Sequence, residues 1–101
     1  MIIRQNRYTV QAEYAAQNKE DIRRIMEELR ALRRTDIESN IFVEDDGKTF
    51  IHLLFCANEE AEKVFFMLES VNAWRSALAG SHPEVPPTMS TLTAIALPRF
   101  Q

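Results

Sequence analysis

The hydrophobic positions along this chain follow two periods, two residues in some stretches and three to four in others. Every second residue from Tyr8 to Tyr14 is apolar or aromatic, which predicts a strand that starts as early as Ile3. A second alternation over residues 37–44 includes several polar side chains and predicts a strand at the edge of a sheet. Residues 91–97 predict the last strand of the chain.

Two longer stretches have the spacing of helices. Asn18 is a good N-cap for a helix that runs to about Arg34. Asn58 caps a second helical stretch, in which Ser70 would start a new segment after a kink and Gly80 would close the C-terminus. The apolar stripe of the first helix contains Ile22, Ile25, Met26, Leu29 and Leu32, and that of the second contains Ala61, Val64, Phe65, Leu68 and Val71, widened by Phe66, Met67, Trp74 and Leu78.

A hairpin and an apolar strand lie between these helices. Asp46 and Gly47 predict a tight turn, because Gly readily adopts the positive φ that such a turn requires. Residues 49–56 are nearly all β-branched, aromatic or aliphatic, and the one strongly polar side chain in their middle is His52. A strand of this kind is covered on both faces. Residues 82–87 contain three prolines and predict an extended loop.

The elements therefore follow the order β-α-β-β-α-β. This order predicts an α+β fold of the ferredoxin-like type, a single domain over residues 1–101. Its four-stranded antiparallel sheet would have the first and third strands at the centre and two helices on one face. Because the helices can cover only one face of the third strand, we expect a second copy of the chain to cover the other, which gives a homodimer through the sheet.

Charge and cysteine content narrow the classes of partner and site. A net charge of −3 and a pI near 5.4 indicate neither nucleic acid nor an anionic membrane as a partner. No segment has the apolar core of a signal peptide or the length of a membrane span, so we expect a cytoplasmic protein. The single cysteine, Cys56, excludes an internal disulfide and a cysteine-based metal cluster. Without a metal-binding motif or a Gly-rich phosphate loop, we expect no metal and no cofactor.

The element order, Asn18 at the first helix and the hairpin from Asp46 through Gly47 to His52 together resemble a known superfamily. The chain resembles the dimeric α/β-barrel proteins, and among them the antibiotic-biosynthesis-monooxygenase-like branch, over about residues 7–97. The resemblance implies that two sheets pack face to face in a barrel, with the helices outside and small-molecule sites between sheet and helices. Some members oxygenate aromatic polyketides or quinols without metal or flavin, and others bind or degrade haem.

The sequence departs from the pattern of that branch in two places. Asp36 and Ser39 stand where many members have a glycine and an aromatic residue around the second strand. Residues 58–62 replace the histidine-rich pattern that often follows the third strand in the enzymes. The fold implied by the resemblance does not depend on these positions, whereas the catalytic role does.

His52 is the first candidate for chemistry, because its side chain titrates near neutral pH. In a functional interpretation it is a proton shuttle, a hydrogen-bond donor to a ligand or an axial haem ligand. In a structural interpretation it is hydrogen-bonded inside the barrel or the dimer interface. Gln11 and Glu13, on the predicted neighbouring strand, are the candidates to reach it and to bind a ligand.

Aromatic residues are the second group of candidates. Tyr8, Tyr14 and Trp74 would line a ligand pocket between sheet and helices, or would belong to the core with their polar tips satisfied at its rim. Cys56 is expected to be an inert buried thiol.

Three functions remain open at this point. The first is a small-molecule enzyme, a cofactor-independent monooxygenase of an aromatic or quinol substrate, in which His52 or a tyrosine handles the proton. The second is a non-catalytic dimeric module that binds a small aromatic ligand or another protein. The third is haem binding through His52. Fold analogy alone supports the first, and one fold hosts many functions.

Overall fold

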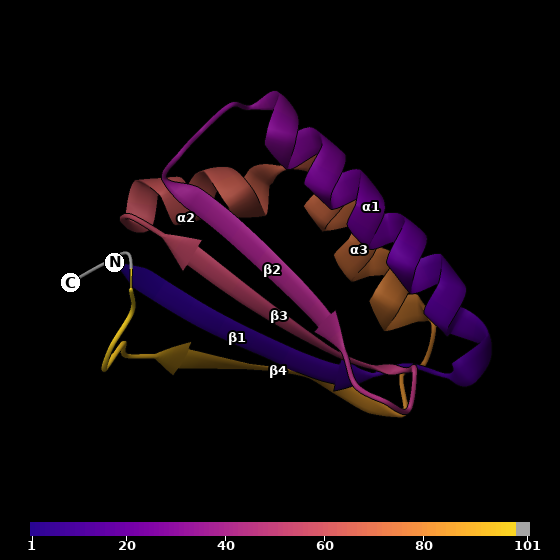
Figure 1. Cartoon of the computed structure of the whole chain (residues 1–101). Coiled ribbons are helices and arrows are strands. Elements are labelled where there is room, and N and C mark those ends of the chain that lie inside the picture. The colour runs from indigo at the N-terminus through magenta and orange to yellow at the C-terminus, as the bar shows by residue number, and fades with distance from the viewer. Residues whose placement is uncertain (99–101) are drawn as a thin grey trace.

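The computed structural model describes residues 1–98, which form a four-stranded antiparallel sheet with helices on one face (Figure 1). The order of strands across the sheet is β2-β3-β1-β4, so β1 and β3 are central and β2 and β4 are edges. The strands span Ile2–Thr9 (β1), Ile37–Val43 (β2), Thr49–Cys56 (β3) and Val85–Leu92 (β4). The predicted ferredoxin-like arrangement, with its central first and third strands and its second strand at an edge, is confirmed.

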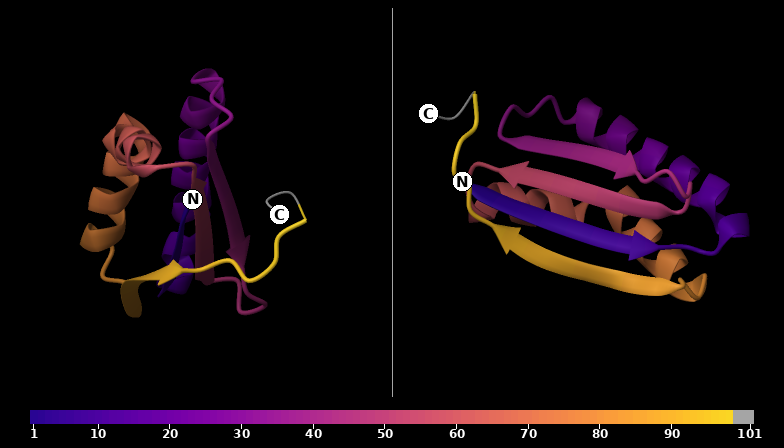
Figure 2. Two further views of the ribbon diagram at one scale, coloured as in Figure 1. Left: turned by 90° about the vertical axis from the view of Figure 1, so that its left-hand side faces the viewer. Right: turned by 60° about the horizontal axis from the view of Figure 1, so that its bottom comes forward.

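The helices all cover the same face of the sheet, and the opposite face is open (Figure 2). A short 3-10 helix, η1, precedes α1, and a break in the second helical stretch separates α2 from α3. Their bounds are Ala12–Tyr14 (η1), Ala15–Ala31 (α1), Glu59–Met67 (α2) and Glu69–Gly80 (α3). None of the helices among the described residues is long and apolar enough to cross a membrane.

The two faces of β3 differ in what covers them. Every second side chain from Phe50 to Cys56 is buried against the helices, and His52 is among them. Ile51, Leu53 and Phe55 point to the open face and are only half-buried. Within a single chain, therefore, the apolar side chains of β3 are fully covered on one face alone.

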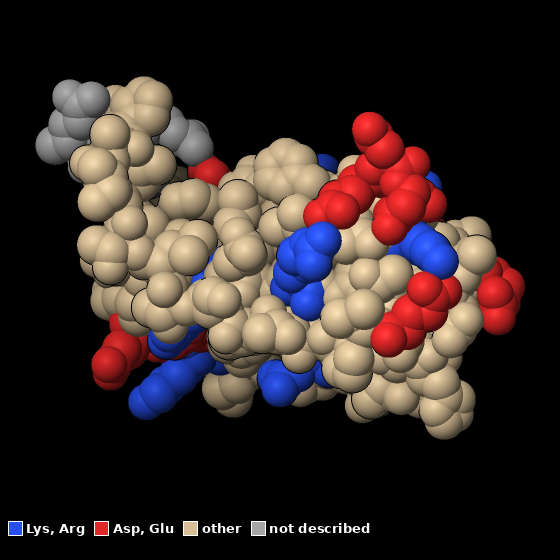
Figure 3. All heavy atoms as spheres, turned by 90° about the horizontal axis from the view of Figure 1, so that it is seen from below, with Lys and Arg blue, Asp and Glu red and all other residues tan. Residues whose placement is uncertain are grey.

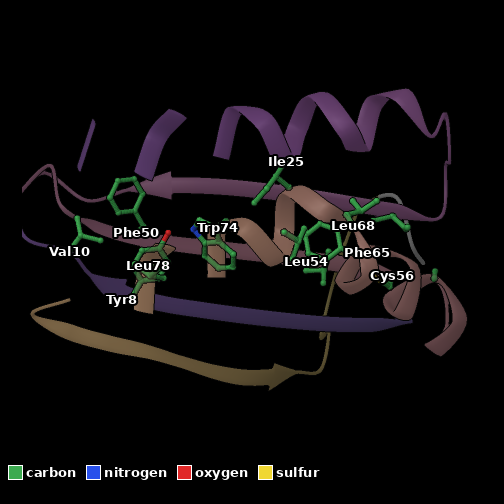
Figure 4. Packing of buried hydrophobic residues seen from close by; sticks show 13 residues of the cluster. Tyr8, Val10, Ile25, Phe50, Leu54, Cys56, Phe65, Leu68, Trp74 and Leu78 are labelled. Atoms are coloured by element: carbon green, nitrogen blue, oxygen red, sulfur yellow. The ribbon is translucent and has the colours of Figure 1, made fainter. Parts of the chain in front are cut away.

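The helix-facing side of the sheet holds the hydrophobic core (Figure 4). The largest fully buried members include Tyr8, Phe50 and Ile25, and Tyr8 stacks on Phe50 with ring centroids 5.6 Å apart. Trp74 and Leu78 of α3 pack against the same strands. This core places residues of β1 and α3, which are far apart in the sequence, beside His52.

The predicted first strand is wrong beyond Thr9. The chain leaves the sheet there and turns through η1, where the Tyr14 amide donates to the carbonyl of Gln11. Gln11 and Glu13 consequently do not lie on the central strand beside His52. Of the four alternating residues, only Tyr8 and Val10 are buried, whereas Ala12 is exposed and Tyr14 is half-buried. So short an alternation does not distinguish a continuing strand from a strand end followed by a turn.

The start of the first helix also lies elsewhere than predicted. α1 begins at Ala15, so Asn18 is not its N-cap but a fully buried residue in its first turns. A buried asparagine needs hydrogen-bond partners, which here come from other elements rather than from the helix end.

The last strand begins six residues earlier than predicted, and the predicted loop over residues 82–87 is wrong in its second half. β4 starts at Val85 and contains Pro86 and Pro87. A proline lacks the backbone N–H that a central strand needs, but β4 pairs only with β1 and has a free edge. Residues 93–98 are not in a strand.

The predicted break in the second helical stretch is confirmed, but it lies at Leu68 rather than at Ser70. Leu68 has an extended backbone with φ −61° and ψ 136°. Asn58 is confirmed as the N-cap of α2, since its side chain accepts a hydrogen bond from the amide of Ala61. Ser70 is not the cap of α3, and Gly80 is the last helical residue rather than a left-handed one. The left-handed residue after α3 is His82, with φ 55°.

Candidate functional site

His52 lies between the sheet and α3, where aromatic rings surround it. Its imidazole stacks on the indole of Trp74, with centroids 4.8 Å apart, and lies 5.3 Å from the ring of Tyr8. The side chain points from the helix-facing side of β3, so burial leaves only 9% of the residue exposed. This polar ring is therefore placed inside an aromatic layer.

A chain of three hydrogen bonds ends at His52. Trp74 Nε1 donates to Asn18 Oδ1 at 3.1 Å, and Asn18 Nδ2 donates to Tyr8 Oη at 2.8 Å. Tyr8 Oη is in turn 2.7 Å from Nε2 of His52. The four residues come from α3, α1, β1 and β3. The chain of bonds therefore links two helices to the two central strands of the sheet.

The direction of these bonds follows from the chemistry of the groups. An indole N–H can only donate, which fixes the oxygen of the Asn18 amide toward Trp74 and its nitrogen toward Tyr8. The Tyr8 oxygen accepts from Asn18, and its one hydrogen has the ring nitrogen of His52 as its acceptor. Nε2 of His52 is then unprotonated, and the neutral imidazole carries its hydrogen on Nδ1.

Burial sets the ionisation of both ends of this contact. Desolvation lowers the pKa of His52 to about 4, so the imidazole is neutral at physiological pH. Desolvation is also the largest influence on Tyr8 and raises its pKa to about 12, against the hydrogen bond from Asn18, which lowers it. The Tyr8–His52 pair is therefore a neutral hydrogen bond with the hydroxyl as donor.

A small inner cavity of about 30 Å³ adjoins His52. This volume holds one or two water molecules, or a hydroxyl group, but not an aromatic ring. The amide oxygen Oδ1 of Asn6 is buried and has no hydrogen-bond partner among residues 1–98. Asn6 lies directly opposite His52 in the β1–β3 ladder, and both residues line the cavity. The remaining lining residues are Arg4, Ile25, Ser39, Ile41, Leu54, Phe65, Phe66, Trp74 and Met89.

A larger outer pocket of about 270 Å³ lies next to the inner cavity, between α3 and β4. Asn6, Phe66, Trp74 and Met89 line both spaces, so the two adjoin along these four side chains. A closed apolar cavity of roughly 150 Å³ is enough to hold benzene. The outer pocket, which Arg75, Leu78 and Pro87 complete, therefore has room for one aromatic ring.

Arg4 lines the inner cavity, but its charge is already neutralised. Its guanidinium donates to both carboxylate oxygens of Glu62, at 2.7 and 3.1 Å, and to the hydroxyl of Thr91. This bidentate pair ties β1 to α2 and β4. Arg4 is therefore not a free cation for an anionic ligand.

No protein-family model matches the sequence, and no curated protein does. Solved structures are similar in fold. An antibiotic biosynthesis monooxygenase matches with a TM-score of 0.79 and 13% identity over 95% of this chain and 100% of that one. Rv0793 from Mycobacterium tuberculosis matches with a TM-score of 0.79 and 9% identity, covering 96% and 97%. SnoaB, a cofactor-independent oxygenase from Streptomyces nogalater, matches with a TM-score of 0.72 and 14% identity, covering 97% and 96%.

The chain has the fold of the antibiotic biosynthesis monooxygenases. This confirms the fold of a single chain that the hairpin and the element order implied, whereas the pairing of two sheets in a barrel stays a prediction. The match extends over nearly the whole chain, whereas identities of 9–14% carry no residue roles. The role of each side chain in this antibiotic-biosynthesis-monooxygenase-like fold has to come from its own geometry.

The structure brings together three of the six residues predicted for the site. His52 and Trp74 stack and line the same cavity, and Tyr8 is hydrogen-bonded to His52. Gln11 donates from Nε2 to the carbonyl of His82 at the end of the sheet, and Glu13 is exposed on η1. The Tyr14 hydroxyl lies 3.5 Å from a carboxylate oxygen of Asp21. None of these last three side chains lines the inner cavity or the outer pocket.

The remaining titratable groups of interest are the thiol of Cys56 and any cluster of side chains that could bind a metal. Cys56 is a free, buried thiol, and burial raises its pKa to about 11, so it is not a nucleophile at neutral pH. No group of three or more histidine, cysteine or acidic side chains that could hold a metal ion occurs among residues 1–98.

Four residues of the site were not predicted from the sequence, namely Asn6, Asn18, Phe66 and Met89. Asn6 precedes the start of the alternation at Tyr8 and gave no signal of its own. Asn18 gave the signal of a helix cap, because an asparagine before an apolar helical stripe has the same local sequence whether it caps or is buried. Phe66 and Met89 could have been found only from the positions of α2 and β4.

Proposed function

We propose that this protein binds a small aromatic or quinol-type molecule in the outer pocket, with a polar group of that molecule in the inner cavity beside His52. The observation that carries the proposal is the buried, unpartnered Oδ1 of Asn6 at the inner end of an aromatic-lined pocket. Buried acceptors are nearly always satisfied, so this oxygen points to a partner that binds there. Apolar pockets with a few convergent polar groups are typical of small-molecule sites.

Trp74 allows this proposal to be tested directly. It is the only tryptophan, and it lines both the inner cavity and the outer pocket. Titration with hydroquinone is expected to shift the single indole N–H resonance in a saturable manner. A resonance that does not move up to millimolar ligand would contradict the proposal.

A pair of methionine variants controls for non-specific binding. Met89 lines both spaces, and Met89→Arg is expected to abolish the saturable shift by filling the pocket with a longer, charged side chain. Met67 is 78% exposed and lines neither space, so Met67→Arg is expected to leave the titration unchanged.

A second candidate function is catalysis, as a cofactor-independent monooxygenase. It is supported by the fold likeness to SnoaB, a cofactor-independent oxygenase, and by the aromatic side chains of Phe66 and Trp74 that line both spaces. His52 is the proposed catalytic residue, and its neutral imidazole can accept a proton only if the hydrogen bond from Tyr8 is released. Oxygen consumption with a bound quinol, lost in His52→Gln even at a quinol concentration that saturates the variant, would support this function over ligand binding alone.

The open face of the sheet is the proposed interface of a homodimer. Half-buried Ile51, Leu53 and Phe55 lie there beside Phe42, which is 55% exposed. Figure 3 shows that uncharged residues fill most of this side of the molecule, with basic side chains near its middle and most of the acidic ones toward one end. A small domain gains stability from covering such a surface, and a second copy offers the same apolar strip in return.

A further inference from the structure

We propose that Trp74, Asn18 and Tyr8 are positioning residues that hold His52 as an Nδ1–H donor, so that His52 and Asn6 together recognise a hydroxyl group. This inference rests on the proposed ligand pocket and adds to it the kind of group that the inner cavity selects. The positions of hydrogen-bond donors and acceptors in the site allow it to discriminate between ligands that have the same size and apolarity.

The first step is the tautomer of His52. The indole of Trp74 can only donate, and that constraint passes through the amide of Asn18 to the hydroxyl of Tyr8. If Nε2 of His52 carried the hydrogen instead, Tyr8 would accept twice and its own buried hydrogen would lack an acceptor. The other tautomer therefore leaves one polar hydrogen unsatisfied, and the chain of bonds selects Nδ1–H.

The second step is the pair of groups left for a ligand. Tyr8 occupies Nε2 of His52, so Nδ1–H is the ring group available to a molecule in the cavity. Asn6 contributes an acceptor, its unpartnered Oδ1, from the position opposite His52 in the ladder. The cavity thus offers one donor and one acceptor. A hydroxyl group satisfies both, since it accepts from the imidazole and donates to the amide oxygen, whereas an ether oxygen can only accept.

The third step is size. The inner cavity of about 30 Å³ admits a hydroxyl group and excludes a ring. The outer pocket of about 270 Å³, which shares Asn6, Phe66, Trp74 and Met89 with it, admits the ring that bears the hydroxyl. A phenolic molecule would therefore place its two parts in two spaces of matching size and polarity.

The tautomer is tested by ¹⁵N NMR of the histidine rings of the whole chain. In the unaltered protein, His52 is expected to show a protonated Nδ1 and an unprotonated Nε2 at neutral pH. Tyr8→Phe removes the donor to Nε2 and should abolish this selectivity, whereas Tyr14→Phe, which removes the hydroxyl of a tyrosine outside the chain of bonds, should retain it.

Asn18→Asp provides a sharper variant. The introduced carboxylate cannot donate, so the Tyr8 hydroxyl would turn toward it and Nε2 of His52 would become the donor to Tyr8. The expected result is an inverted tautomer. A protonated Nε2 in the unaltered protein, or an unchanged His52 spectrum in Tyr8→Phe, would overturn the positioning role.

The recognition of a hydroxyl is tested with phenol and anisole, which differ by one methyl group on the oxygen. Phenol is expected to shift the Trp74 indole resonance with at least 10-fold higher affinity, and Asn6→Leu should bring the two affinities together. Equal binding of both molecules by the unaltered protein would overturn the hydroxyl specificity and leave the pocket intact. Binding of neither would overturn the proposed function itself.

Discussion

Glu28 of α1 caps α3 by accepting two hydrogen bonds from Ser70. The Oε1 atom of Glu28 is 2.9 Å from the backbone nitrogen of Ser70 and 2.6 Å from its hydroxyl oxygen. The first amides of a helix have no partner within it, and α3 has no side-chain cap of its own. A carboxylate from the neighbouring helix therefore takes the place of an N-cap and joins α1 to α3 across the break at Leu68.

Glu28→Ala is expected to lower the free energy of unfolding by about 1 kcal/mol, the usual cost of a lost N-cap. The hydrogen bond from the Ser70 hydroxyl is the largest of the causes that lower the pKa of Glu28, so its contribution fades as the pH falls and the carboxylate is protonated. Urea denaturation at pH 7 measures the loss. The matched control is Glu27→Ala, because Glu27 is exposed and its ion pair is with Arg23 on the same helix. Its removal should change stability by less than about 0.5 kcal/mol.

The two glycines of the chain should respond to the same substitution in opposite directions. Gly47 has a φ of +76° in the hairpin turn, which an alanine adopts only with strain. Gly80 ends α3 without a left-handed φ, and nothing lies within 4 Å of an added Cβ. We expect Gly47→Ala to destabilise by about 1 kcal/mol and Gly80→Ala to stabilise by about 0.4–1 kcal/mol. Thermal unfolding of both variants checks this, and two changes of the same sign would contradict it.

Acid should destabilise the protein through His52. The pKa of this imidazole is about 4 in the folded chain and about 6.5 when unfolded, so the unfolded state binds more protons between these values. The free energy of unfolding is therefore expected to decrease by about 3 kcal/mol as the pH falls from 6.5 to 4, and not further on this account below pH 4. Denaturant unfolding at a series of pH values measures the slope.

Variants of the two histidines separate the contribution of His52 to the pH dependence of stability from that of other titratable groups. His52→Gln is expected to remove the part of the slope between pH 4 and 6.5 and to cost about 1–3 kcal/mol at pH 7, because Tyr8 loses its buried partner. His82 is exposed and has a φ of 55°, which asparagine tolerates. His82→Asn should therefore keep the full slope, and an equal effect of both variants would exclude His52 as its source.

The dimer is tested at Ile51, which lies on the open face of β3, rather than at Leu54, which faces the helices. Ile51→Glu is expected to give an unfolded or aggregated chain, because a charge in the proposed interface leaves the apolar strip without a cover. Light scattering of the unaltered chain should give the mass of a dimer at micromolar concentration. Ser76→Glu, on the exposed side of α3, should leave that mass unchanged, and a stable monomeric unaltered chain would contradict the interface.

Short-range features of this protein were determined by the sequence alone. The hairpin at Gly47, the strand that contains His52 and the Asn58 cap were predicted correctly, because each depends on residues within a few positions of one another. Element order then led to the ferredoxin-like sheet, since a β-α-β-β-α-β chain has few ways to bury its apolar faces. The break near Ser70 was also visible, although the group that caps the helix after it was not.

Only the tertiary structure decided what surrounds His52. Asn18 lies ten positions from Tyr8 and 56 from Trp74, and nothing local distinguishes a buried asparagine that links them from a helix cap. The strand predicted over residues 91–97 lies instead at Val85–Leu92, because the free edge beside β1 accepts prolines that local rules exclude. The inner cavity and the outer pocket are spaces between elements. Their size and the unpartnered oxygen of Asn6 depend on how distant side chains pack, a property that hydrophobic periodicity does not contain.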